Sequence, residues 1–322
     1  MRRFGWFFAW FFLTPPLLAD SGGLAVASAS QVVMGTVLEV TVTASGTEEA
    51  ARLASEAITI ARHWDQVLSP FLDHSELRLL HKQQGRPVFV SESLDWALQR
   101  AVDLTRATGG AFEPAYLSAL PPGATGREPM PLLPKVVLWR QGGVLLQPGA
   151  RIDPGAFGKG IAVDAILDWV RRQGANEVFV NFGGSSFARA ASRQLHRSPR
   201  RILLPDNAGR ALGIVELVEG SLSVSESGVH DDASPITDPR SGAPVASRRM
   251  AAAWAREGIV ADAWSTALVV LGRDGLVLAR QHRVEAAIID DQGVAITKGF
   301  PCHRWPRHEE LTKISAVEDD RP

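Results

Sequence analysis

The segment from Arg151 to Ser186 carries the groups best suited to binding an anion. It begins D-P-G-A-F-G-K-G, so that a glycine-rich turn opens a helix. Asp153 is suited to cap that helix, and Pro154 fits the first turn, where a missing N–H costs no hydrogen bond. Free backbone amides at a helix N-terminus attract phosphate, and Lys159 lies beside them. The pattern is not a P-loop, because the spacing is too short and no Ser or Thr follows the lysine. The residues alone leave a phosphate site and a plain tight helix entry as alternatives.

Composition limits the classes of protein to which the chain can belong. Its 322 residues, 45% of them hydrophobic, suffice for one large or two modest domains. Charged residues make up 21% and the formal net charge is −1, which gives no sign of a nucleic-acid surface. The single cysteine, Cys302, excludes an internal disulfide and a multi-cysteine metal site.

Residues 1–19 have the pattern of an export signal. Arg2 and Arg3 precede an apolar run from Phe4 to Leu13, and a signal peptidase could cleave after Ala19. Ten residues are too few to span a bilayer but suit the apolar core of a signal. We therefore expect an exported, periplasmic protein, or one tethered to the inner membrane if the signal is uncleaved.

The rest of the chain mixes helical and strand-like periodicity. Apolar residues at helical spacing predict these helices: Thr47–Leu68, Ser93–Thr108, the segment from Asp153 to Gly174, Ala261–Leu271 and Gly275–His282. Short or alternating apolar runs predict these strands: Met34–Thr43, Glu177–Phe182, 136–139, 144–146, 202–204, 214–217, 285–289 and 294–297. Residues 117–134 are rich in proline and glycine and predict a surface loop. The pattern indicates an α+β fold with mixed sheets and packed helices, followed by a charged tail at 298–322.

Seven short motifs follow one another along the chain. They are M-G-T at Met34, S-P-F-L-D-H-S-E-L at Ser69, T-G-G-A-F-E-P at Thr108, D-P-G-A-F-G-K-G at Asp153, N-F-G-G at Asn181, I-T-D-P-R-S-G-A-P-V at Ile236 and A-D-A-W-S-T-A-L at Ala261. In order and spacing, residues 31–297 resemble the FAD:protein FMN transferases, the ApbE-type flavin transferases. The resemblance implies the ApbE-like fold and an exported enzyme that binds FAD and uses Mg²⁺ to split its pyrophosphate. It also implies a partner, a target flavoprotein subunit whose Thr or Ser hydroxyl receives FMN as a phosphoester.

The resemblance places a magnesium site on Asp262, Thr266 and the backbone carbonyl of Ala156. Asp262 and Thr266 are four residues apart and so share one face of the expected helix. A carboxylate with a hydroxyl suits Mg²⁺, which prefers oxygen ligands and keeps substrate phosphates in its shell. Without the resemblance, a plain helix N-cap would be the simpler reading of Asp262.

The resemblance also implies which residues contact the flavin nucleotide. Lys159 and Asp153 match positions that reach FAD, and Thr237 matches one whose backbone approaches it. The other matched positions, where apolar and aromatic faces can hold a ring, are Met34, Phe71, Ala111, Phe112 and Glu113. The alternative for these five is ordinary core and turn.

One departure from the family pattern bears on catalysis. Pro235 stands where the family has a histidine that is a candidate base for the attacking hydroxyl, and proline cannot accept a proton. His230, five residues earlier, is a candidate replacement, or else a solvated turn residue. Ser185 stands where the family has an acidic residue. The alternative to a transferase is therefore a non-catalytic FAD-binding or an FAD-hydrolysing member of the same family.

Overall fold

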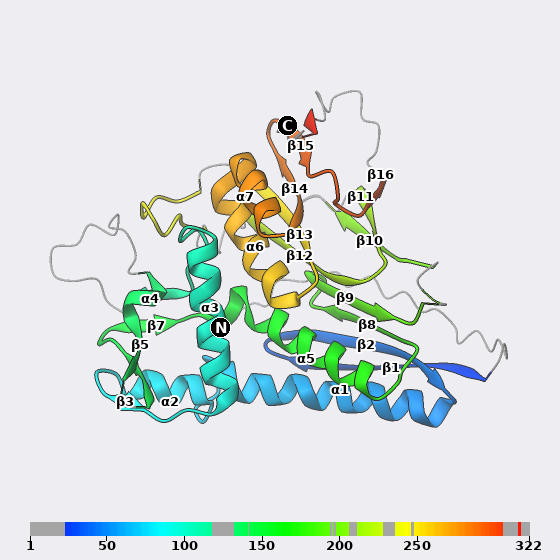
Figure 1. Cartoon of the computed structure of the whole chain (residues 1–322), viewed down its shortest axis with the longest axis horizontal. Helices are drawn as coiled ribbons and strands as arrows, with labels where there is room; N and C mark the ends of the chain where they lie inside the picture. The colour runs from blue at the N-terminus through cyan, green and yellow to red at the C-terminus, as the bar shows by residue number, and fades with distance from the viewer. Residues whose placement is uncertain are drawn as a thin grey trace, which may run out of the picture.

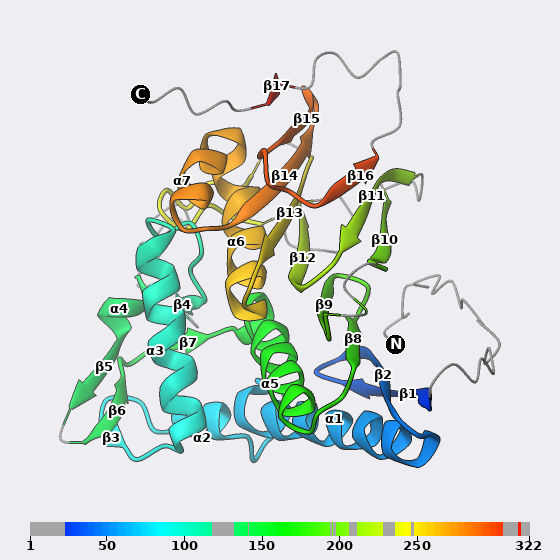
Figure 2. The same cartoon turned by 45° about the vertical axis from the view of Figure 1, so that its right-hand side comes forward.

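A nine-stranded sheet forms the centre of the computed structural model, which describes residues 23–117, 132–140, 142–193, 195, 198–205, 211–227, 236–245, 248–304 and 315–316. The strand order is β1-β2-β8-β9-β12-β13-β14-β15-β17, and all pairs are antiparallel except β15 with β17. The bounds are β1 Leu24–Val33, β2 Thr36–Ser45, β8 Glu177–Phe182, β9 Ser186–Ala191, β12 Gly220–Ser227, β13 Arg249–Ala255, β14 Glu285–Asp290, β15 Gly293–Ile296 and β17 Ser315–Ala316. Figures 1 and 2 show this sheet rising from the blue β1–β2 hairpin to the orange β14 and β15.

Three helices cover one face of this sheet. They are α1 (Thr47–Leu68), which packs on β1 and β2, α5 (Gly158–Arg172), and α6 (Gly258–Leu271), which packs on β12 and β13. Their buried apolar residues form one continuous core with the strands beneath them. Two more helices, α3 (Glu92–Ala107) and α7 (Gly275–Gln281), flank this layer (Figure 1). Four of the five helices lie within three residues of the ranges that apolar periodicity predicts, whereas α5 begins five residues after Asp153 because Pro154–Ala156 forms a separate 3₁₀ turn.

Smaller elements complete the fold on both sides. The first group lies around α3 (Figure 1): α2 (Glu76–Lys82), α4 (Leu133–Val136), the sheet of β3 (Pro87–Val88), β6 (Gly143–Leu146) and β5 (Val137–Arg140), and the pair β4 (Ala115–Leu117) and β7 (Ala150–Ile152). The second group is a sheet of β10 (Arg200–Pro205), β11 (Ala211–Leu217) and β16 (Cys302–Arg304), and it encloses a second core. The charged tail thus contributes β16 and β17.

The mixed α+β class is confirmed. The bounds of one predicted strand are wrong, because it starts two residues later than expected. The strand expected to start at Met34 starts at Thr36, because Met34 and Gly35 form the two-residue turn between β1 and β2. Met34 has φ 49° and Gly35 has φ 77°, as a type I′ hairpin turn requires. In the part of the chain that the structure describes, no helix combines the length and apolar character needed to cross a bilayer.

Candidate functional site

Four of the seven motifs meet around one cavity of about 450 Å³, a volume typical of cofactor pockets. The β1–β2 turn, the loop after α1, the turn that opens α5 and the turn after β8 each contribute part of its wall. The lining residues are Met34, Gly35, Thr36, Asp65, Leu68, Ser69, Pro70, Phe71, Leu72, Asp153, Pro154, Gly155, Gly158, Lys159, Gly183 and Ser185. Segments far apart in the sequence therefore share one concave site.

The turn before α5 supplies the cationic wall of the cavity. Asp153 caps a short 3₁₀ turn, η1 (Pro154–Ala156), by accepting a 2.8 Å hydrogen bond from the Gly155 N–H. The predicted cap therefore exists, but it caps η1 rather than α5 itself. Lys159 lies one turn further on, and its ammonium donates only a long 3.4 Å bond to the Gly155 carbonyl. Among the described residues, no carboxylate lies within ion-pair distance of Lys159, so its charge is available to an anion.

Behind this turn, α5 and α6 cross at a close contact between two glycines. A Cβ on Gly160 would collide with the Gly258 carbonyl, so neither position tolerates a side chain without displacement of the backbone. Asp262, 4% exposed, accepts a 3.1 Å hydrogen bond from the Gly160 N–H and a 2.8 Å bond from the Ser223 hydroxyl. A carboxylate on α6 therefore satisfies a free amide in the first turn of α5.

The same crossing is held in the opposite direction by Asp164 of α5. Its carboxylate accepts hydrogen bonds from the first amides of α6, those of Gly258 and, at 2.9 Å, Ile259. Burial raises the pKa of Asp164 to about 7, against the effect of the two amides, and Glu257 and Asp168 add to the rise. A carboxylate of each helix thus accepts hydrogen bonds from amides in the first turn of the other. We call this arrangement of Asp164 and Asp262 the reciprocal cap.

The oxygen atoms around the reciprocal cap fit a hard cation. Each Asp262 oxygen uses one lone pair for its hydrogen bond and keeps another, and the half-buried Thr266 hydroxyl contacts the Asp262 carbonyl and Ser225. Among the described residues, no donor is bonded to the Ala156 carbonyl, because the Gly160 N–H goes to Asp262 instead. In the described ranges, no group of three or more His, Cys, Asp or Glu side chains is arranged to hold a metal ion by itself. The donors here are one carboxylate, one hydroxyl and one carbonyl, a set that leaves room for substrate phosphates.

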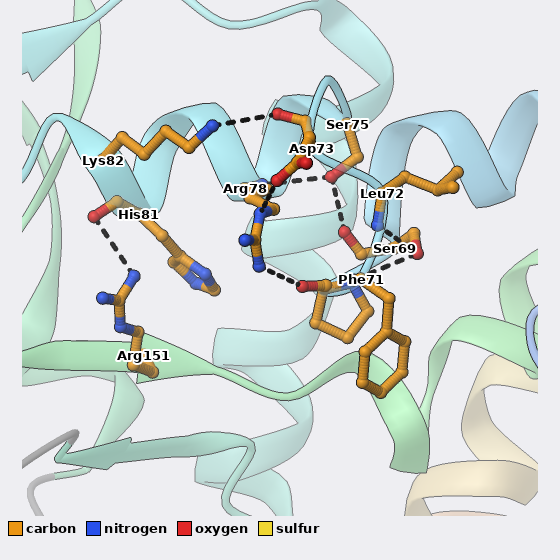
Figure 3. A network of polar contacts seen from close by, with 10 residues as sticks. Ser69, Phe71, Leu72, Asp73, Ser75, Arg78, His81, Lys82 and Arg151 are labelled. Atoms are coloured by element: carbon orange, nitrogen blue, oxygen red, sulfur yellow. Dashed lines mark hydrogen bonds and ion pairs between the residues drawn. The ribbon is translucent and has the colours of Figure 1, made fainter.

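At the opposite wall, the loop after α1 holds Phe71 on a fixed backbone, as Figure 3 shows. The Ser69 hydroxyl accepts hydrogen bonds of 3.3 Å from the amides of Phe71 and Leu72. Arg78 of α2 donates 3.0 Å bonds to the Pro70 carbonyl and to Asp73. The Phe71 ring itself is 86% exposed. A rigid loop thus presents an apolar ring to the cavity.

A buried histidine connects this loop to the turn that opens α5. His81 of α2 accepts a 3.0 Å hydrogen bond from the Ile152 amide, next to Asp153. Burial, together with the charges of Arg151 and Arg78, lowers the pKa of His81 to about 4, so the imidazole is neutral at pH 7 and can accept a hydrogen bond. The two walls of the cavity are therefore joined through α2.

Comparison with known proteins identifies the family. The family model described as "ApbE family" matches residues 34–289, most of the chain. The chain belongs to the ApbE family. A "FAD:protein FMN transferase" of Treponema pallidum is 28% identical over 285 residues, 76% of this chain and 78% of that protein. The solved "Flavin Transferase ApbE from Vibrio cholerae" superposes with a TM-score of 0.70 at 20% identity, covering 84% of this chain and 96% of that one. The Pseudomonas stutzeri "flavinyl transferase ApbE, apo form" superposes with a TM-score of 0.68 at 23% identity, covering 85% of this chain and 95% of that one.

The remaining predicted contacts of this ApbE-family protein do not line the cavity. Ala111 and Phe112 are buried in the core, where the Phe112 ring meets Phe157 edge to face at 6.1 Å. Glu113 accepts bonds from the amides of Ala115 and Leu133, and burial raises its pKa to about 7. Thr237 is exposed and pairs with Pro244 in a short hairpin.

Other predicted features lie outside the described residues. These are the export signal at 1–19, His230 and the Pro235 substitution. Conversely, Asp164 and Ser223 have no local sequence signal, because their partners are 94 and 39 residues away along the chain. Asp65 and Ser185 also line the cavity without a binding role having been assigned to them.

Proposed function

We propose that this protein is a flavin transferase that cleaves FAD and attaches FMN to a Thr or Ser hydroxyl of a target flavoprotein. The observation that carries the proposal is the turn that opens α5. Lys159 lines the cavity at this turn. The neighbouring Gly160 N–H donates a hydrogen bond to Asp262, the carboxylate that suits a magnesium ion. The name of the Treponema pallidum relative supports the same activity.

The reaction requires one phosphorus–oxygen bond to form and another to break. The acceptor hydroxyl oxygen bonds to the FMN-side phosphorus of FAD, the bridging bond to the AMP half breaks, and AMP leaves. The hydroxyl proton passes to a base or to water. The Lys159 ammonium and the amides of Gly158 and Lys159, which have no acceptor among the described residues, are placed to hold the pyrophosphate and to stabilise its added negative charge. Phe71 and Met34 offer apolar surface to the isoalloxazine ring.

Asp262, Thr266 and the Ala156 carbonyl are the residues that would hold Mg²⁺. When bound, Mg²⁺ polarises the phosphoryl oxygens and neutralises charge on the leaving group. The reciprocal cap keeps Asp262 against the start of α5, so the carboxylate stays next to the phosphate-binding turn.

A direct experiment uses the chain without residues 1–19, FAD, MgCl₂ and flavin-free candidate acceptor subunits of exported redox enzymes. We expect an acceptor to gain the mass of FMN less one water, with one AMP released per adduct. EDTA should stop both the FMN attachment and the AMP release. Riboflavin in place of FAD should give neither. Acceptors that stay unmodified while AMP and FMN appear would show an FAD hydrolase instead.

The Pro235 substitution favours a second candidate, an FAD-binding protein without turnover. His230→Ala separates the two. If His230 takes the hydroxyl proton, transfer should slow by about 100- to 10,000-fold with FAD affinity unchanged. FAD binding by the parent without AMP release at any pH would favour the binding protein.

We also propose that the protein is exported, because residues 1–19 have the pattern of a signal. Sequencing the N-terminus of the protein from the periplasmic fraction would test this. A start near residue 20 supports cleavage, and a start at Met1 in the membrane fraction supports a tether.

A further inference from the structure

Among the described residues, the first strand of the central sheet pairs with another strand on one side only. Within the described residues, β1 pairs with β2 and forms one edge of the sheet, whereas the opposite edge ends in the two-residue β17. β1 is ten residues long and reads L-A-V-A-S-A-S-Q-V-V, with no charge, no proline and no glycine. Proteins ordinarily protect long edge strands with such residues, because an open edge accepts another strand.

The register of the hairpin shows which backbone groups of β1 are free. Val33 and Thr36 flank a two-residue turn, so they form a hydrogen-bonded pair, and the pattern alternates from there. Val32, Ser30 and Ser28 consequently direct their N–H and C=O groups away from β2. Their side chains are exposed as well, on the face opposite α1. Among the described residues, the outer edge of β1 therefore offers N–H and C=O groups that can hydrogen-bond to another strand.

This edge leads directly to the cavity. The turn at its end, Met34-Gly35-Thr36, lines the cavity wall, and Figure 1 shows the hairpin running from the outer end of the sheet to the middle of the molecule. A chain segment paired with β1 would thus end beside the turn that lines the cavity.

We propose that β1 is the docking strand for the acceptor protein, of which an extended segment pairs with β1 and delivers the Thr or Ser hydroxyl to the cavity. The inference rests on the proposed function, since that reaction requires a polypeptide at the cavity mouth. Strand addition uses backbone hydrogen bonds for affinity, which the outward N–H and C=O groups of β1 can supply.

The test is Ser30→Pro, compared with Ser30→Ala. Proline removes one outward N–H without breaking the ladder to β2, as is tolerated on edge strands, and alanine keeps that N–H. With the acceptor subunit that the parent labels, we expect Ser30→Pro to raise the acceptor KM about 10-fold or more. Ser30→Ala should behave as the parent, and the FAD KM should be unchanged in both. Ser28→Pro provides a second variant if Ser30→Pro fails to bind FAD.

The outcomes separate the two proposals. Labelling by Ser30→Pro and Ser28→Pro at the parent's acceptor KM would overturn docking on β1 and leave the transferase standing. A parent that labels no acceptor would overturn both. A parent that sediments as a dimer, with a monomeric Ser30→Pro, would assign the edge to a second copy of this chain and overturn acceptor docking.

Discussion

At the α5–α6 crossing, next to the turn that lines the cavity, polar groups are bonded to one another, whereas at the loop end exposed apolar side chains stand on a fixed backbone. Asp262 is buried and Asp164 is half-buried, and each accepts hydrogen bonds from backbone amides of the other helix. Phe71 is almost fully exposed, and only its backbone is held. The difference suits a substrate that has a charged part, which polar groups held in place can bind, and an aromatic ring, which an apolar side chain can contact. Changes at the buried end should therefore affect chemistry, and changes at the loop end should affect binding.

The largest effect is expected at Asp262. Asp262→Asn keeps the shape: its carbonyl oxygen can accept from Gly160, and its amide can donate to Ser223, whose hydroxyl can reverse. The charge that a magnesium ion requires is lost. We expect FAD cleavage, measured as AMP release, to fall about 100-fold or more, with the melting temperature nearly unchanged.

Ser223→Ala is the matched control, since it removes the hydrogen bond and keeps the charge. It should retain most of the activity. Equal losses in the two variants would show that Asp262 supports the helix crossing and does not bind the metal.

The second effect concerns Asp164, which touches neither substrate nor metal in this arrangement. In Asp164→Asn, the amide can accept from only one of the two N–H groups of α6, which should destabilise the fold by about 1–3 kcal/mol. The Mg²⁺ concentration for half-maximal activity should rise about 10- to 100-fold, since Asp262 loses its position. Asp103→Asn, on the exposed face of α3, should change neither.

The Asp164 variant also has an expected pH dependence. Burial raises the pKa of Asp164 from 3.8 to about 7, so over that range the folded protein holds a proton that the unfolded chain releases. The stability contributed by this carboxyl is fully present below about pH 4 and is lost as the pH rises through 7. The difference in melting temperature between parent and Asp164→Asn should therefore be larger at pH 4 than at pH 8. A constant difference would contradict the raised pKa.

The same contrast explains which parts the sequence could predict. Long helices and the turn at Asp153 carry local signals, namely apolar periodicity, a capping residue and glycines. The Met34 turn does not, because a non-glycine residue with positive φ has no reliable pattern. The reciprocal cap joins residues far apart in sequence, so Asp164 looked like any polar position on an amphipathic helix. The resemblance supplied Asp262, but only the fold shows what holds it.

Lys159 lies between the two ends and tests where the phosphate binds. Lys159→Ala should weaken FAD binding about 10-fold, as expected for one charge-assisted hydrogen bond, and leave riboflavin binding unchanged. Fluorescence titration with both ligands measures this, and Lys135→Ala, an exposed lysine outside the cavity, is the control. Equal weakening of both ligands would mean that Lys159 stabilises the turn rather than the phosphate.

The smallest effect is expected at Phe71, at the exposed end. The chain offers a close control in Phe89, which is 83% exposed against 86% for Phe71 but does not line the cavity. If the Phe71 ring contacts the flavin, Phe71→Ala should weaken FAD and riboflavin equally, by about 2- to 10-fold, because both ligands carry the ring. The rate of AMP release at saturating FAD should not change, since the buried end is intact. Phe89→Ala should leave both affinities at the parent value. A loss confined to FAD would move Phe71 from the ring to the phosphate or adenine part of the substrate, and a fall in the saturated rate would show that the exposed end also shapes the chemistry.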